Sequence, residues 1–242
     1  MTFDIKTIDR PRSIVYGRER IHYETTFVDR TTLEIGVEPD GSVHVRAPRG
    51  RSAEVVHDHV QRRARWIVRQ RRYFDEIGSP PPPKDYVSGE SVWYLGRQYR
   101  LRILEADTDR TRLRGPYLEI ETASQDRDHV RRLVNGWYRQ RAEHRLPERY
   151  DLGAAQVRRY GIEAPPFRIR RMATRWGSYT PSGRIMLNPE LMSVPLYCID
   201  YVVVHELCHV AHPHHGPEFY ALLDRVVPDW RKAKDRLDRA RV

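Results

Sequence analysis

The segment His205-Glu206-Leu207-Cys208-His209 contains residue types that can hold a metal ion and move a proton. Residues four positions apart on an α-helix project from nearly the same face, so the imidazoles of His205 and His209 can reach one ion. Zinc binds histidine nitrogen at about 2.0–2.1 Å, which both side chains can satisfy. Glu206 projects into an adjacent sector, from which its carboxylate can contact a water on the metal without being a ligand. This spacing indicates a zinc-dependent hydrolase.

A catalytic zinc site needs a third protein ligand, because it uses three protein ligands and one open position. Pro213 is expected to end the helix shortly after His209 and to turn the chain back toward the metal. His212, His214 and His215 are then the nearby candidates. We favour His215, which opens the next apparent helix. His212, three residues after His209, remains the main alternative at this point.

The elements that must position these residues follow from the surrounding pattern. The run after Pro195, LYCIDYVVVHELCHVAH, predicts a helix whose apolar middle is buried. Residues 167–172 and 184–188 are predicted to be strands of one hairpin, and residues 176–183 to be the loop between them. A long helical pattern precedes them, over residues 124–160. Pro147 and Gly153 predict that it is divided into two or three helices.

The N-terminal third alternates as strands do, which predicts a hairpin or small β-meander followed by a helix from Ser52 to about Glu76. Four prolines, Pro80 to Pro83, form the clearest internal boundary. We therefore assign residues 13–78 to an N-terminal subdomain, 79–85 to a Pro-rich connector and 86–242 to the catalytic region. All of these could form a single domain. We detect no internal repeat.

The net charge of +10 comes almost entirely from arginine, since lysine occurs only four times. Six arginines lie on the predicted N-terminal helix, which is compatible with nucleic-acid binding, although a solvated helix face is the simpler interpretation. Cys198 and Cys208 are too few for a disulfide framework or a thiolate zinc cage. No stretch has the roughly 18 apolar residues of a membrane helix, and the first residues lack a secretory apolar region. A cytoplasmic location is expected.

Two segments of the chain, RWGSYTPSGRIMLNPEL and IDYVVVHELCHVAHPHHGPEFY, resemble the YgjP-like metallopeptidase domain, which is related to the SprT and WLM zinc peptidases. The segment VEPDGSVHVRAPRG and the following RARWI resemble the N-terminal part of that family. The C-terminal segments are the more specific ones. Tyr179 departs from the family pattern, which commonly has cysteine or another small residue after RWGS.

The resemblance implies that His205, His209 and His215 are the metal ligands, which strengthens His215 over His212. It also implies an α+β fold with a zincin-like, gluzincin-type core, built from an active-site helix and a β-hairpin. In such a core a strand borders the cleft, and residues 184–188 are the natural candidate for that strand.

The expected chemistry is hydrolysis by a zinc-activated water, with Glu206 as general base. A peptide substrate could pair with the strand at residues 184–188. Asp200 is a candidate for a contact behind the ligands, or for a helix-dipole interaction. Tyr201, Tyr220 and Arg175 are conceivable oxyanion partners, and none is favoured.

Two other functions remain open. The first is metal-dependent hydrolysis of nucleotides or other phosphate esters or anhydrides, which the arginine surplus would suit. The second is a nucleic-acid-associated adaptor whose metal site is secondary. The sequence predicts no membrane partner and gives no oligomeric state.

Overall fold

The computed structural model describes residues 8–38, 40–77 and 84–240. The chain divides into two compact units between Pro81 and Pro82. Each unit has its own buried core. Most of the predicted connector lies outside the described residues.

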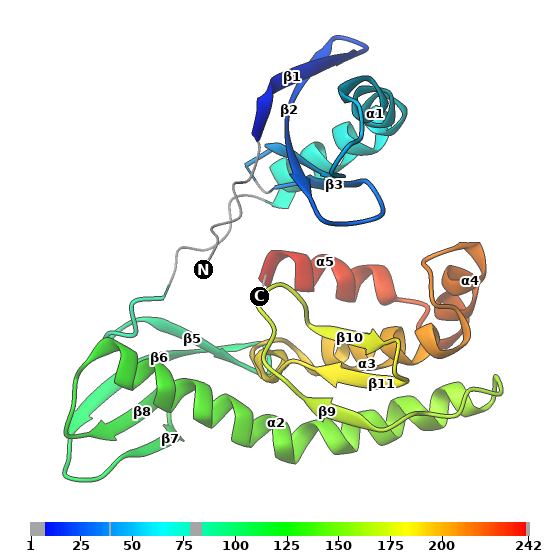
Figure 1. Cartoon of the computed structure of the whole chain (residues 1–242). Helices are drawn as coiled ribbons and strands as arrows, with labels where there is room; N and C mark the ends of the chain where they lie inside the picture. The colour runs from blue at the N-terminus through cyan, green and yellow to red at the C-terminus, as the bar shows by residue number, and fades with distance from the viewer. Residues whose placement is uncertain (1–7, 39, 78–83, 241–242) are drawn as a thin grey trace. The chain divides into compact units, whose positions relative to one another are not determined.

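The N-terminal unit is a four-stranded sheet packed against one helix (Figure 1). Its strand order is β1-β2-β4-β3, with β2 and β4 parallel and the two outer pairs antiparallel. The predicted helix is confirmed as α1, and its apolar face packs on the sheet. The predicted hairpin is confirmed as β3 and β4, but a simple meander is wrong, since β2 bypasses β3 to pair with β4. The elements are β1 (Ile8–Tyr16), β2 (Glu19–Val28), β3 (Glu34–Val37), β4 (Val43–Pro48) and α1 (Ala53–Ile77).

The C-terminal unit begins with a second four-stranded sheet and continues into the longest helix of the described chain. The elements of this part are β5 (Ser91–Tyr94), β6 (Arg97–Glu105), β7 (Arg110–Arg114), β8 (Tyr117–Thr122) and α2 (Arg127–Arg158). Figure 1 shows α2 running along the whole unit, from this sheet toward β9.

A three-stranded sheet, a 3-10 helix and three further helices complete the C-terminal unit. They are β9 (Phe167–Ile169), β10 (Gly177–Thr180), β11 (Arg184–Leu187), the 3-10 helix η1 (Pro189–Ser193), α3 (Leu196–Ala211), α4 (Pro217–Val226) and α5 (Trp230–Ala240). The expected α+β class is therefore confirmed. No helix within the described ranges combines the length and apolarity needed to cross a bilayer.

The two four-stranded sheets share one topology. In the second sheet the order is β5-β6-β8-β7, β6 and β8 are parallel, and a long helix again follows the last strand. The expectation of no internal repeat is thus wrong at the level of topology. The repeat is hidden in the sequence because few identities survive, as in Ser13-Ile14-Val15-Tyr16 against Ser91-Val92-Trp93-Tyr94.

The prediction that α2 is divided into two or three helices is wrong. The helix is continuous over 32 residues, with Pro147 inside it. Buried residues lie on both sides of Pro147, including Leu146 and Tyr150, so packing holds the helix together across the missing hydrogen bond. Gly153 is a packing position: a Cβ there would lie 2.7 Å from Val203 of α3.

The hairpin before α3 also differs from the prediction. Residues 177–180, expected to be loop, form β10, which pairs antiparallel with β11. β9 pairs parallel with β11 on its other side. The Thr180 hydroxyl closes the β10–β11 turn, donating to the Arg184 carbonyl and accepting from its N–H, at 3.0 and 3.1 Å. Gly177 is unfavourable in a strand, and Pro181-Ser182-Gly183 directly after β10 is turn chemistry, which explains the missed β10.

Candidate metal centre

The helix α3 is seated by contacts at its N-terminal end. The turn between β5 and β6 donates two backbone hydrogen bonds to η1, from Leu95 N–H to the Met192 carbonyl (2.7 Å) and from Gly96 N–H to the Ser193 carbonyl (3.3 Å). A Cβ at Gly96 would lie 2.6 Å from Pro195, the residue that begins α3. Glycine is needed there both for this close approach and for its φ of 79°. These contacts fix where α3 starts.

A charged pair ties α3 to α2. The Arg149 guanidinium donates to both carboxylate oxygens of Asp200, at 2.6 and 2.5 Å. This bidentate pair raises the pKa of Arg149, chiefly through the hydrogen bonds that Arg149 donates to Asp200. Asp200 is therefore a partner of α2; the described contacts place it against Arg149, not behind a histidine.

The structure brings His205, His209 and His215 together. Their candidate ligand atoms all lie within 4.8 Å of one another. The Nε2 atoms of His205 and His215 are 3.0 Å apart, close to the roughly 3.3 Å that separates two nitrogens on a tetrahedral zinc with Zn–N of about 2.0–2.1 Å. His215 arrives from the loop before α4, as the helix break at Pro213 requires.

The remaining ring nitrogens of two histidines have partners that orient the rings. His209 Nδ1 donates to the His212 carbonyl at 3.1 Å, which leaves its Nε2 for a ligand role. The Tyr201 hydroxyl lies 3.4 Å from Nδ1 of His205. Phe219 of α4 is fully buried and packs against all three imidazoles, with ring centroids 4.7 to 5.0 Å away.

Burial keeps these imidazoles neutral, the state that binds a metal. It lowers the pKa of His205 to about 3, with smaller contributions from His209 and His215. Partial burial also lowers the pKa of His209 and that of His215, whose side chain is the most exposed of the three.

His212 and His214, the other candidates, lie outside the three-histidine group. His212 is the residue at the C-terminal end of α3, and its Nδ1 is 3.9 Å from the Glu218 carboxylate. His214 is exposed.

Glu206 is buried on the side of α3 that faces β10. A Cβ at Gly177 would lie 2.8 Å from both Cγ and Oε1 of Glu206, so only glycine leaves room for this carboxylate. Burial raises the pKa of Glu206 to about 7, while the backbone N–H of Tyr179 and the charge of Arg175 act in the opposite direction. Tyr179 departs from the family pattern in its side chain only. Its backbone N–H still reaches Glu206, since any residue except proline supplies that N–H.

A cavity of about 220 Å³ opens beside Glu206 and His205. Its walls come from β10 with the preceding loop, from α3 and from α5. Arg175 and Lys234 give it positive charge, although Lys234 also pairs with Asp238 at 2.5 Å. Of the three conceivable oxyanion partners, Arg175 and Tyr201 line this cavity. Tyr220 is exposed and stacks near His215 and Trp230.

Sequence reasoning missed Gly177, Phe219 and Lys234 as parts of the site. Gly177 and Phe219 stand inside the two quoted segments, where a small residue next to β10 and an aromatic residue four positions after His215 were the available signals. Lys234 carries no signal in sequence, because only the folding of α5 over the cleft brings it near.

Comparison with known proteins identifies one family. The model of the YgjP-like metallopeptidase domain matches residues 31–240, nearly the whole chain. No curated protein matches significantly. The same is true of solved structures.

Proposed function

Because the chain belongs to the YgjP-like metallopeptidase family, we propose that it is a zinc-dependent peptidase with a zincin-type centre. In this proposal His205, His209 and His215 hold the metal and Glu206 is the general base. The observation that carries it is the convergence of three neutral imidazoles beside a buried carboxylate on the same helix.

The donor set fits zinc. Imidazole nitrogen suits zinc among the common divalent ions, and three protein ligands are the number found in catalytic sites. When bound, zinc would polarise the substrate carbonyl and make a water more acidic. The orienting contacts of His205 and His209 are of the kind that hold metal ligands in place.

Glu206 is placed to move the proton of the reaction. Its carboxylate accepts a proton from the attacking water and later passes it to the departing amine. Gly177 allows it to sit against β10, and the Tyr179 N–H holds it there. Arg175, on the wall of the cavity, contributes positive charge beside it.

The substrate edge proposed for a peptide is β10. Residues 184–188 were expected to border the cleft and pair with substrate, but β11 is paired on both sides, with β10 and with β9, so that expectation is wrong. β10 is the edge strand, and it packs against α3 next to Glu206. An extended peptide can therefore add to the sheet only at β10 on this side.

The first test is metal content by elemental analysis of the purified protein and of three variants. We expect about one zinc per chain, lost or sharply weakened in His205→Ala and His215→Ala. His212→Ala is the matched control and should keep its zinc. A wild-type protein that cannot be loaded with zinc would remove the basis of the proposal.

The second test is cleavage of a peptide mixture, read by mass spectrometry. Glu206→Gln should keep the zinc and lose about 10²- to 10⁴-fold in rate, the usual contribution of a general base. If no peptide is cut but nucleotides release phosphate or pyrophosphate in a Glu206-dependent way, the proposed substrate class is wrong. The proposed metal centre is then retained.

A further inference from the structure

In the C-terminal unit, the 3-10 helix η1 fills the space between the β5–β6 turn and α2. The β5–β6 turn donates backbone hydrogen bonds to η1, and α2 packs on η1 from the other side. η1 carries an acidic residue, Glu190, which pairs with Arg171 at 3.2 Å. Its carboxylate lies near Tyr138 of α2, and burial together with this charge raises the pKa of Tyr138.

The N-terminal unit has the same strand order, but α1 contacts β1 directly, whereas α2 has few contacts with β5 and packs on η1. The strands flanking its β1–β2 turn are in the same register, with Tyr16 opposite Glu19 where the other unit has Tyr94 opposite Arg97. Four buried positions in each helix have the same spacing, which aligns Val68 with Tyr138. They are Val60, Ala64, Ile67 and Val68 in α1, and Val130, Val134, Trp137 and Tyr138 in α2.

At the equivalent place the N-terminal unit has an open groove of about 500 Å³. Among the described residues of the N-terminal unit, no segment fills this groove as η1 fills the space between the β5–β6 turn and α2. It is lined by the turn and by α1, through Tyr16, Arg65, Val68, Arg69, Arg72 and Tyr73.

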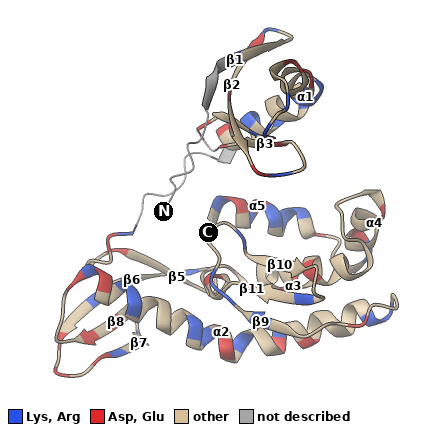
Figure 2. Cartoon of the chain, viewed as in Figure 1, with Lys and Arg blue, Asp and Glu red and all other residues tan. Residues whose placement is uncertain are grey.

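The groove is basic. The stretch of α1 from Gln61 to Phe74 contains six arginines and no acidic residue, and Figure 2 shows this basic character along α1. Arg72 lies 3.5 Å from Glu19, whereas neither Arg65 nor Arg69 has an acidic partner in the described part of the unit. Arginines without partners favour a ligand that brings carboxylates of its own.

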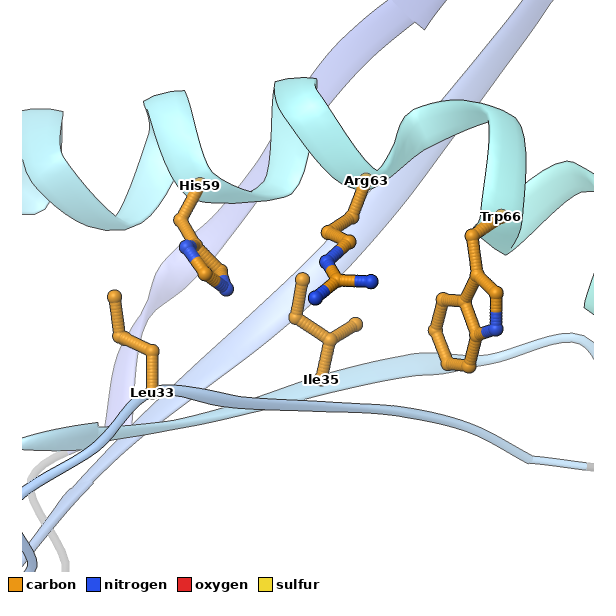
Figure 3. Close-up of a pocket in the computed structure, with 5 residues that line it drawn as sticks. All are labelled: Leu33, Ile35, His59, Arg63 and Trp66. Carbon is orange, nitrogen blue, oxygen red and sulfur yellow. The ribbon is translucent and has the colours of Figure 1, made fainter. Parts of the chain in front are cut away.

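The other flank of α1 has a smaller hollow of about 290 Å³, where His59, Arg63 and Trp66 face Leu33 and Ile35 (Figure 3). In both units this flank of the helix packs on an edge strand, β3 or β7. The described residues of the C-terminal unit therefore offer no occupant for this hollow, and it gives no guide to a ligand.

We propose that the groove between the β1–β2 turn and α1 binds an acidic polypeptide segment of a protein substrate. The repeated frame supplies the class of ligand, because a polypeptide turn with an acidic residue occupies its counterpart. The arginines supply the preference for acid. That the bound protein is also cut rests on the proposed peptidase function; the binding itself does not.

The test is fluorescence anisotropy with labelled peptides, on full-length Glu206→Gln protein so that no probe is cut. The first probe has the sequence of residues 188–195, NPELMSVP; the second carries Met192→Glu and the third Glu190→Gln. We expect the affinity to rise with acidity, by about fivefold to tenfold across the series at low salt. The Arg65→Ala/Arg69→Ala variant should weaken binding of the most acidic probe about tenfold.

Arg62→Ala is the matched control, because Arg62 is exposed on α1 but does not line the groove. It should leave the affinity unchanged, and thermal unfolding should show both variants equally folded. Arg69→Glu alone gives a second, stronger perturbation.

The proposal is overturned if affinity ignores peptide charge, or if the groove variants bind like Arg62→Ala. It is also overturned if a 15-nucleotide deoxythymidylate strand binds more tightly than every peptide and loses affinity in the groove variants. That result would make single-stranded nucleic acid the ligand. If the protein binds acidic peptides in this way but cuts no peptide, the proposed binding groove is supported and the proposed peptidase function is refuted.

Discussion

At the scale of single residues, the site depends on the close approach of Glu206 to β10. Gly177 lies beside its carboxylate, and this contact leaves no room for a methyl group. The reactive geometry of the carboxylate is thus set by a residue that has no side chain and takes no part in chemistry.

We predict that Gly177→Ala displaces the Glu206 carboxylate and lowers the turnover rate about 10²-fold, the effect typical of a small misplacement. Zinc content should stay near that of the wild type, because the three histidines are not contacted. Steady-state kinetics and elemental analysis check this. Unchanged kinetics would show that Glu206 can move aside without loss.

We also predict that neither cysteine reacts with a thiol reagent in the native protein at pH 8. Both are fully buried, and burial raises the pKa of Cys198 to about 11 and that of Cys208 to about 12. Titration with a chromogenic disulfide should find two thiols only after denaturation. A Ser182→Cys variant, with the new thiol at an exposed position, should react at once and serves as the positive control.

The sequence was informative about the candidate metal ligands because the spacing of His205 and His209 follows from helix geometry. Pro213 indicated the helix break, and the family resemblance favoured His215 as the third ligand. It could not indicate that Asp200 pairs with Arg149, because that contact joins residues 51 positions apart on two helices. Nor could it indicate the groove in the N-terminal unit, which depends on the spacing of a turn and a helix.

At the scale of elements, the packing of α2 on α3 helps to position the helix that carries His205 and His209. Gly153 lets the two helices approach closely, and the pair of Arg149 with Asp200 joins them near the start of α3. Sequence rules interpreted Pro147 and Gly153 as breaks. They fail here because tertiary packing outweighs local propensity in a helix with a buried face.

We predict opposite effects for two Gly→Ala changes in α2. Gly153→Ala should destabilise the C-terminal unit by about 1–3 kcal/mol, because the new methyl group overlaps Val203. Gly136→Ala, at an exposed position with open space around it, should stabilise by up to about 1 kcal/mol. Thermal unfolding measures both. Equal effects of the same sign would contradict the packing role of Gly153.

At the scale of the whole molecule, the two units have separate cores. The three candidate metal ligands all belong to the C-terminal unit. A ligand that binds only the folded form of one unit stabilises that unit alone.

We therefore predict two calorimetric transitions, of which zinc shifts only one. At a free zinc concentration about 100 times the dissociation constant, the stabilisation is about 2.7 kcal/mol. For a unit of this size that raises the midpoint by roughly 5–10 °C. His205→Ala should abolish the shift and leave the other transition in place. A single transition that moves as a whole would show that the units unfold together.

The contact between the β5–β6 turn and η1 has a consequence for the order of folding. The turn at Leu95 and Gly96 is synthesised first, and Met192 and Ser193 follow 97 residues later. Closing so long a loop costs chain entropy, and contacts between distant residues slow folding. We therefore expect His205, His209 and His215 to come together only after this loop has closed, because the contact fixes where α3 starts.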